Sequence, residues 1–84
     1  MNQPNNLAGD VALVLEDILA ERVDPAALDA KLIADYGANS MDVVDIVERL
    51  ERRFKITIPN NDIEKLASFG DVVAYVASHV SAES

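Results

Sequence analysis

The stretch SMDVVDIVERLERRF, residues 40–54, has the most regular pattern in this chain of 84 residues and decides its fold. At 100° of rotation per residue, its large apolar side chains fall within an arc of about 100°. These are Val43, Ile46, Val47, Leu50 and Phe54. The opposite side carries Asp45, Glu48, Arg49 and Arg52. The spacing therefore predicts an amphipathic helix over 40–54 that buries one face.

Three further segments show helical spacing of apolar residues. A first helix is predicted over about 6–21, with Asn6 or Asp10 as its N-cap. A short helix is predicted at 62–66, and a last helix over 69–80 with Asp71 near its positive end.

The remaining segments are predicted to connect these helices. Residues 56–58 alternate like a strand but have no partner strand, so we expect an extended connector. Residues 22–39 are expected to contain a short helical turn near 25–30 and to pack through Leu28, Leu32, Ile33 and Tyr36. The expected fold is an all-α four-helix bundle without a β-sheet, a single domain over 1–84 with an ordered core at about 6–80.

The composition of the chain excludes several classes of function. Fifteen acidic and seven basic residues give a net charge of −8, which repels nucleic acids and anionic membranes and favours basic protein surfaces. No apolar run is long enough to cross a bilayer and the first residues do not resemble a signal peptide, so we expect a cytoplasmic protein without membrane insertion. The absence of cysteine excludes disulfides.

Neither catalytic residues nor metal ligands are predicted. The single histidine, His79, lies in the last helical turn, where it complements exposed carbonyl groups. No serine and aspartate are spaced with it as a triad. Residues 35–39 place Gly37 where a calcium loop needs an oxygen ligand.

The junction Gly37-Ala38-Asn39-Ser40-Met41-Asp42 is the candidate site. Asn39 and Ser40 are both ordinary N-cap residues, and a capping serine needs no function. If Asn39 is the cap and pairs with Asp42 in a capping box, Ser40 becomes the first helical residue. Its hydroxyl is then a free nucleophile at the positive end of a helix.

Met41 is the second unusual feature, because it projects from the polar side of the predicted helix, with Val44 at the edge. A flexible apolar side chain inside a charged rim is typical of a docking anchor, although single exposed apolar residues are common. The candidate partner-binding residues are Met41, Asp42, Val44, Asp45 and Glu48.

These residues resemble the acyl carrier proteins. The attachment motif of that family, Asp-Ser-Leu at the start of the second helix, corresponds to Asn39-Ser40-Met41. Residues 54–59, FKITIP, are similar to the segment that closes that helix, and 62–66 and 71–76 resemble the third and fourth helices. The resemblance covers residues 6–80.

The resemblance implies a discrete carrier in which a phosphopantetheinyl transferase attaches 4′-phosphopantetheine to Ser40. The thiol of this arm holds acyl intermediates as thioesters for the acyl-transfer, condensing and modifying enzymes of fatty-acid, polyketide or specialised lipid biosynthesis. The expected carrier is a monomer whose partners have basic docking surfaces. The family's acyl cavity would be lined here by Val47, Leu50, Ile63, Leu66 and Val72, a set equally compatible with a plain core.

Departures from the family pattern leave alternatives open. Asn39 replaces an acid and Met41 a leucine, while Arg49, Arg52 and Arg53 bring positive charge to the second helix, and Asn60 and Asn61 are neutral. These differences indicate a specialised partner set. An aminoacyl or peptidyl carrier is a second reading, although Gly37-Ala38 stands where such carriers usually have Gly-Gly. A third is an unmodified acidic adaptor that docks basic enzyme surfaces.

Overall fold

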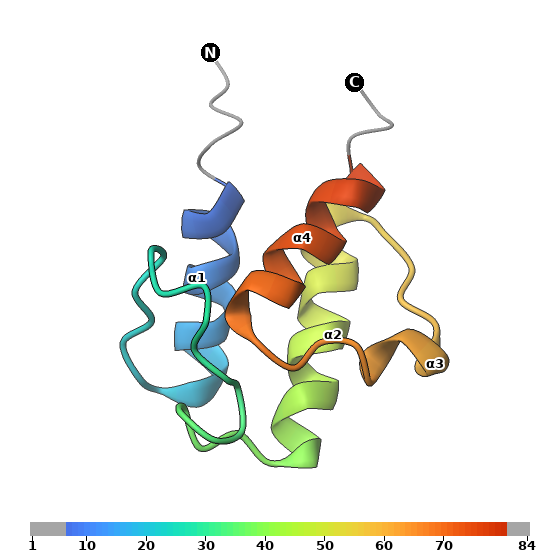
Figure 1. The fold of residues 1–84 in the computed structure, drawn as a ribbon. Coiled ribbons are helices and arrows are strands. Elements are labelled where there is room, and N and C mark those ends of the chain that lie inside the picture. Colours follow the sequence, from blue (N-terminus) through green and yellow to red (C-terminus); the bar gives the residue numbers. More distant parts are fainter. Residues whose placement is uncertain (1–6, 81–84) are drawn as a thin grey trace.

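The computed structural model describes residues 7–80, which form four helices (Figure 1). They are α1 (Leu7–Leu19), α2 (Ser40–Phe54), α3 (Asn60–Ile63) and α4 (Phe69–Val80). Helices α1, α2 and α4 pack against one another, and α3 lies at the side of the bundle (Figure 1). An isolated antiparallel bridge joins Lys31 and Ser68, and residues 7–80 contain no strand. The prediction of an all-α bundle with three longer helices and one short helix is confirmed.

The core lies between the three long helices. Val11 and Leu15 of α1, Leu50 of α2, and Val72 and Val76 of α4 are fully buried. Every buried residue in the described range is apolar, so the core contains no polar group that needs a partner.

Helix α2 has the bounds that its pattern predicts. Its C-cap Lys55 adopts the left-handed conformation at φ 58°, and the Lys55 N–H donates to the Glu51 carbonyl. The Glu51 carboxylate accepts a 2.9 Å hydrogen bond from the Ile58 N–H, which holds the next segment against α2. That segment is a connector with neither helix nor strand.

Helix α1 is shorter than the predicted 6–21. It ends at Leu19 because Ala20 adopts φ 56°, a left-handed conformation that stops the helix. Asp10 lies within α1 and is not its N-cap. The other predicted cap, Asn6, lies outside the described residues.

The long connection from α1 to α2 differs from its prediction in two ways. Figure 1 shows it running beside α1 before it reaches the start of α2. It contains two successive turns, closed by hydrogen bonds from Ala27 to Asp24 and from Ala30 to Ala27, in place of a helical turn near 25–30.

The side chains that hold this connection also differ. Leu32 is buried and Tyr36 partly buried, but Leu28 and Ile33 are 47% and 63% exposed and do not hold it down. Val23 and Ala38 are buried in their place. Pattern alone could not identify them, because the segment has no helical or strand period to assign a buried face.

Backbone hydrogen bonds attach the connection to the start of α4. The Phe69 N–H donates to the Ala30 carbonyl and the Gly70 N–H to the Leu28 carbonyl, both at 2.8 Å. A Cβ at Gly70 would lie 2.8 Å from the Leu28 oxygen, so this contact requires glycine. Leu28 therefore takes part through its backbone while its side chain remains exposed.

Helix α3 begins earlier than the predicted 62–66. Pro59 is its N-cap, and the helix covers Asn60–Ile63 before a turn brings Leu66 into the core. Helix α4 covers the predicted 69–80 and begins with a capping box that was not predicted. The Asp71 N–H donates to Ser68 Oγ and the Ser68 N–H donates to Asp71 Oδ2, both at 3.1 Å.

Candidate functional site

Asn39 is the N-cap of α2. Its side-chain oxygen accepts a 2.8 Å hydrogen bond from the Asp42 N–H, and Asp42 Oδ2 accepts a 3.1 Å hydrogen bond from the Asn39 N–H. Asn39 has extended φ and ψ of −103° and 179°, as an N-cap residue should. The capping box that the sequence suggested is present, and it makes Ser40 the first helical residue.

The Ser40 hydroxyl is exposed and makes no hydrogen bond with any residue of 7–80. Ser68 provides an internal comparison. It lies one position earlier relative to its own helix, as the N-cap of α4, and its hydroxyl accepts from the Asp71 N–H. The different registers explain why one serine is used by the fold and the other is free.

The turn before Ser40 is well anchored. Ala38 is 3% exposed, and its N–H donates to the Leu32 carbonyl at 3.0 Å. Gly37 adopts φ 72°, which suits glycine, and donates to the Ile33 carbonyl at 3.1 Å. Ser40 is therefore presented from a fixed turn.

The start of α2 also offers two backbone donors. The Asp42 N–H is taken by the Asn39 side chain and the Val43 N–H by the Asn39 carbonyl. The N–H groups of Ser40 and Met41 have no partner within the described part of the chain. Free N–H groups and the positive end of a helix dipole favour a phosphate group. The arrangement fits a phosphodiester attached to the Ser40 oxygen.

The residues predicted to bind partners lie on α2, and four of the five are exposed. Met41 is 70% exposed and Val44 is 45% exposed, and Asp45 and Glu48 are exposed beside them. Asp42 is partly buried, as expected for a carboxylate engaged in the cap. We call the surface formed by Met41, Asp42, Val44, Asp45 and Glu48 the α2 outer face. It adjoins Ser40 on the same helix.

The arginines of α2 differ in their ion pairs. Arg49 Nη1 lies 2.6 Å from Asp17 Oδ2, and Arg53 Nη2 lies 3.6 Å from Asp10 Oδ1. Both pairs join α2 to α1, so part of this positive charge is balanced within the fold. Arg52 is exposed and makes no ion pair with another described residue. The sequence showed the charge but not these partners.

The residues assigned to an acyl cavity all lie in or against the core. Val47, Leu50, Leu66 and Val72 are buried, and Ile63 packs against them. The structure brings them together between α2, α4 and the α3 segment. Their positions agree with both sequence readings, a cavity wall and a plain core.

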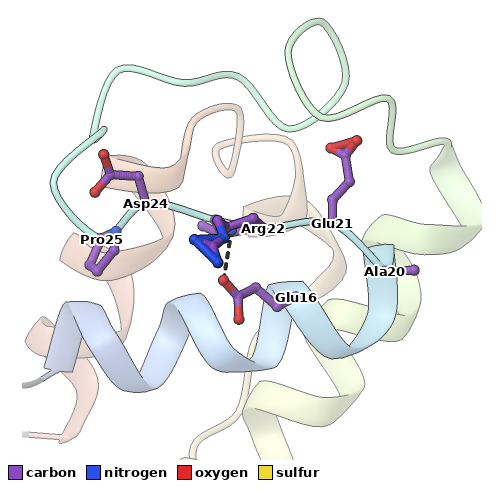
Figure 2. A pocket seen from close by; sticks show the side chains of 7 residues that line it. Glu16, Ala20, Glu21, Arg22, Asp24 and Pro25 are labelled. Atoms are coloured by element: carbon purple, nitrogen blue, oxygen red, sulfur yellow. Dashed lines mark hydrogen bonds between the residues drawn. The ribbon is translucent and has the colours of Figure 1, made fainter.

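A surface pocket lies between the end of α1 and the loop that follows it (Figure 2). Glu16, at its base, already accepts a 2.8 Å hydrogen bond from the Val23 N–H. Figure 2 shows Glu21 and Asp24 directing their carboxylates away from Glu16. Residues 7–80 hold no group of three His, Cys, Asp or Glu side chains that could bind a metal. The role of Glu16 here is to hold the loop.

His79 has a structural role, as the sequence suggested. Its Nδ1 lies 2.9 Å from the Tyr75 carbonyl oxygen, and its ring stacks on the Tyr75 ring with centroids 4.1 Å apart. Among the helices described, none has the length and apolar character needed to span a membrane.

Comparisons with known proteins agree with this geometry. The family model for a phosphopantetheine attachment site matches residues 10–76. An acyl carrier protein of Campylobacter concisus (strain 13826) is 46% identical over 66 residues, covering 74% of this chain and 86% of that protein. An acyl carrier protein of Akkermansia muciniphila is 40% identical over 72 residues, covering 86% of this chain and 90% of that protein. A third, from Campylobacter jejuni subsp. doylei, is 40% identical over 67 residues, or 80% of this chain and 87% of that protein.

Proposed function

Because this chain belongs to the acyl carrier protein family, we propose that the Ser40 hydroxyl is the attachment point of its 4′-phosphopantetheine arm. The chain is a phosphopantetheine-bearing carrier and not an enzyme. The observation that supports Ser40 is its free, exposed hydroxyl at the start of α2, within the matched residues. When attached, the arm supplies a thiol to a chain that contains no cysteine.

The residues around Ser40 suit this attachment. The free N–H groups of Ser40 and Met41 can stabilise the negative phosphodiester, and Asn39 caps α2 without adding a second negative charge beside it. Asp42 is the nearby acid, and its Oδ2 is bound to the Asn39 N–H.

The carrier interacts with a phosphopantetheinyl transferase and with biosynthetic enzymes. We assign the contact with these enzymes to the α2 outer face. Exposed Met41 and Val44 provide an apolar centre, while Asp45 and Glu48 provide charges that attract basic surfaces. A net charge of −8 opposes self-association, which supports a monomer.

The relatives' names support acyl cargo over an aminoacyl or peptidyl cargo. Two of the three arginines that suggested a specialised partner set pair with α1. This weakens the case for a polyketide or unusual lipid pathway, so we favour a fatty-acid or closely related lipid pathway.

Intact mass spectrometry tests the attachment site. The unmodified chain is incubated with coenzyme A and a broad-specificity phosphopantetheinyl transferase, beside the variants Ser40→Ala and Ser68→Ala. We expect the increment of one phosphopantetheine group on the wild type and on Ser68→Ala, and none on Ser40→Ala. An increment that persists in Ser40→Ala would place the arm elsewhere, and no increment on any chain would favour the unmodified adaptor.

A further inference from the structure

A single side-chain hydrogen bond links α3 to α4. The Tyr75 hydroxyl donates to Asp62 Oδ2 at 2.6 Å, across 13 residues of sequence. A hydroxyl that donates to a carboxylate makes one of the stronger hydrogen bonds in proteins. Both side chains are partly shielded from water, which reduces competition from solvent.

Helix α3 has few other means of staying in place. It has four residues, none of them buried, and its N-cap Pro59 provides no side-chain hydrogen bond. A helix this short is not stable by itself in water. Within residues 7–80, the bond from Tyr75 is the only hydrogen bond between α3 and another helix. Apart from it, α3 depends on partly buried Ile63 and on Leu66, which follows it.

Neighbouring side chains contact both Tyr75 and Asp62 and help to position them. The His79 ring stacks on the Tyr75 ring at an angle of 12°, which fixes the tyrosine on α4. Lys65 Nζ lies 3.2 Å from Asp62 Oδ1, which leaves Oδ2 to accept from Tyr75. The two carboxylate oxygens therefore have different partners, and the aspartate needs no rearrangement to receive the hydroxyl.

We infer that Tyr75 is a positioning residue that fastens α3 to α4 through Asp62, and that it limits the opening of the apolar interior to a carried acyl chain. Ile63, in α3, and Leu66, just after it, pack in the same apolar cluster as Leu50 and Val72. Movement of α3 away from α4 would separate these side chains. The effect on an acyl chain rests on the proposed function, whereas the fastening of α3 does not.

Hydrogen exchange on the unmodified chain tests the fastening. The N–H groups of Asp62, Lys65 and Leu66 each donate to a local carbonyl, so their exchange rates report opening of this segment. In Tyr75→Phe we expect them to exchange about ten- to a hundredfold faster, the effect of losing one hydrogen bond to a charged group. Exchange in α1 and α2 should not change. Tyr36→Phe, which removes the hydroxyl of the other tyrosine, is the matched control and should leave α3 unchanged.

Two outcomes would overturn the fastening. One is unchanged exchange in α3, and the other is equal acceleration in all helices, which would mean that only global stability depends on Tyr75. Asp62→Ala should accelerate exchange at least as much as Tyr75→Phe, because it also removes the contact with Lys65. The double variant should exchange no faster than Asp62→Ala alone. Additive effects would show that the two residues act separately.

Whether Tyr75 limits the opening of the interior to an acyl chain, which we call gating, is tested by a second measurement. It uses the chain loaded with an octanoyl thioester. We expect hydroxylamine to cleave the thioester faster in Tyr75→Phe than in the wild type or Tyr36→Phe, because a looser α3 shields the acyl chain less. Equal cleavage in all three would overturn the gating. Failure of the attachment at Ser40 would appear in the mass measurement, independently of exchange in α3.

Discussion

Asn39 and Asp42 cap α2 by each accepting a hydrogen bond from the other's backbone N–H, at 2.8 and 3.1 Å. This exchange leaves the Ser40 hydroxyl free of the fold. Asn39→Ala should lower the free energy of unfolding by about 1 kcal/mol, the usual cost of a lost N-cap, as measured by urea denaturation. It should also slow phosphopantetheine transfer, because the Ser40 hydroxyl becomes the nearest group able to cap α2.

Asn39→Asp is the matched control for that change. It keeps an oxygen in the capping position, so stability and transfer should both stay near those of the wild type. If Asn39→Ala and Asn39→Asp behave alike, the cap does not hold Ser40 in its free position.

Gly70→Ala should destabilise the fold by about 1–3 kcal/mol, the usual range for overpacking. The new Cβ would lie 2.8 Å from the Leu28 oxygen and 3.1 Å from the Leu28 Cβ, where the long connection meets α4. In contrast, a Cβ at Gly9 would meet no atom of residues 7–80 within 4 Å, apart from its chain neighbours and its own helix backbone. Gly9→Ala should therefore add up to about 1 kcal/mol through helix propensity. Thermal or urea unfolding measures both, and destabilisation of equal size in both variants would contradict the steric account.

The long helices could be predicted because each has a sustained apolar period, and α2 and α4 have the predicted ends. The exposed Met41 could be predicted for the same reason, since the period assigns a direction to each side chain. The free Ser40 hydroxyl could be predicted from the capping pair of Asn39 and Asp42. The connection before α2 could not, because Leu28 and Ile33 are apolar but exposed, and the backbone contact at Gly70 leaves no pattern in the sequence.

Contacts between side chains that are far apart in the sequence could not be predicted either. Arg49 and Arg53 were visible as positive charges, but their pairing with Asp17 and Asp10 depends on how α1 packs on α2. Likewise, Tyr75 was read only as part of the last helix, and nothing in its spacing indicated Asp62 as its partner. Such pairs follow from tertiary geometry and become known only with the fold.

Met41→Glu should reduce the efficiency of phosphopantetheine transfer while leaving helical content intact. Met41 is 70% exposed, so its replacement removes little packing, but a carboxylate would be buried against the partner at the apolar centre of the α2 outer face. Ile33→Glu is the matched control, since Ile33 is 63% exposed and lies outside that face. Transfer kinetics and circular dichroism distinguish the two, and equal kinetics in both variants would exclude Met41 as an anchor.

The stability contributed by the Tyr75–Asp62 contact should depend on pH at both extremes. The hydrogen bond from Tyr75, followed by that from Lys65, lowers the pKa of Asp62, with a smaller contribution from the charge of His79. A lowered folded-state pKa stabilises the fold above the unfolded value of about 3.9, and this contribution is lost as pH falls through the folded value.

The pKa of Tyr75 is shifted in the opposite direction, upward. The hydrogen bond to Asp62, then burial and the charges of Asp62 and Glu51, raises the pKa of Tyr75 to about 12. Its contribution is complete below the unfolded value of about 10 and disappears as pH rises through the folded value. The stability difference between wild type and Tyr75→Phe should thus be constant from about pH 5 to about pH 9 and shrink below about pH 4. Urea unfolding across this range measures it, and a difference that persists at low pH would show that the carboxylate is not involved.

Association with the transferase should slow as salt rises, because the Debye length falls from about 10 Å at 0.1 M to about 3 Å at 1 M. Asp45 and Glu48 are exposed on the α2 outer face, so they should attract a basic partner over longer range than Met41 can. The double variant Asp45→Asn, Glu48→Gln should associate more slowly at low salt and depend less on salt. Glu64→Gln removes an exposed acid outside that face and should keep most of the salt dependence. Stopped-flow association rates over this range test the assignment, because an equal loss in the control would mean that net charge alone, and not the α2 outer face, steers the encounter.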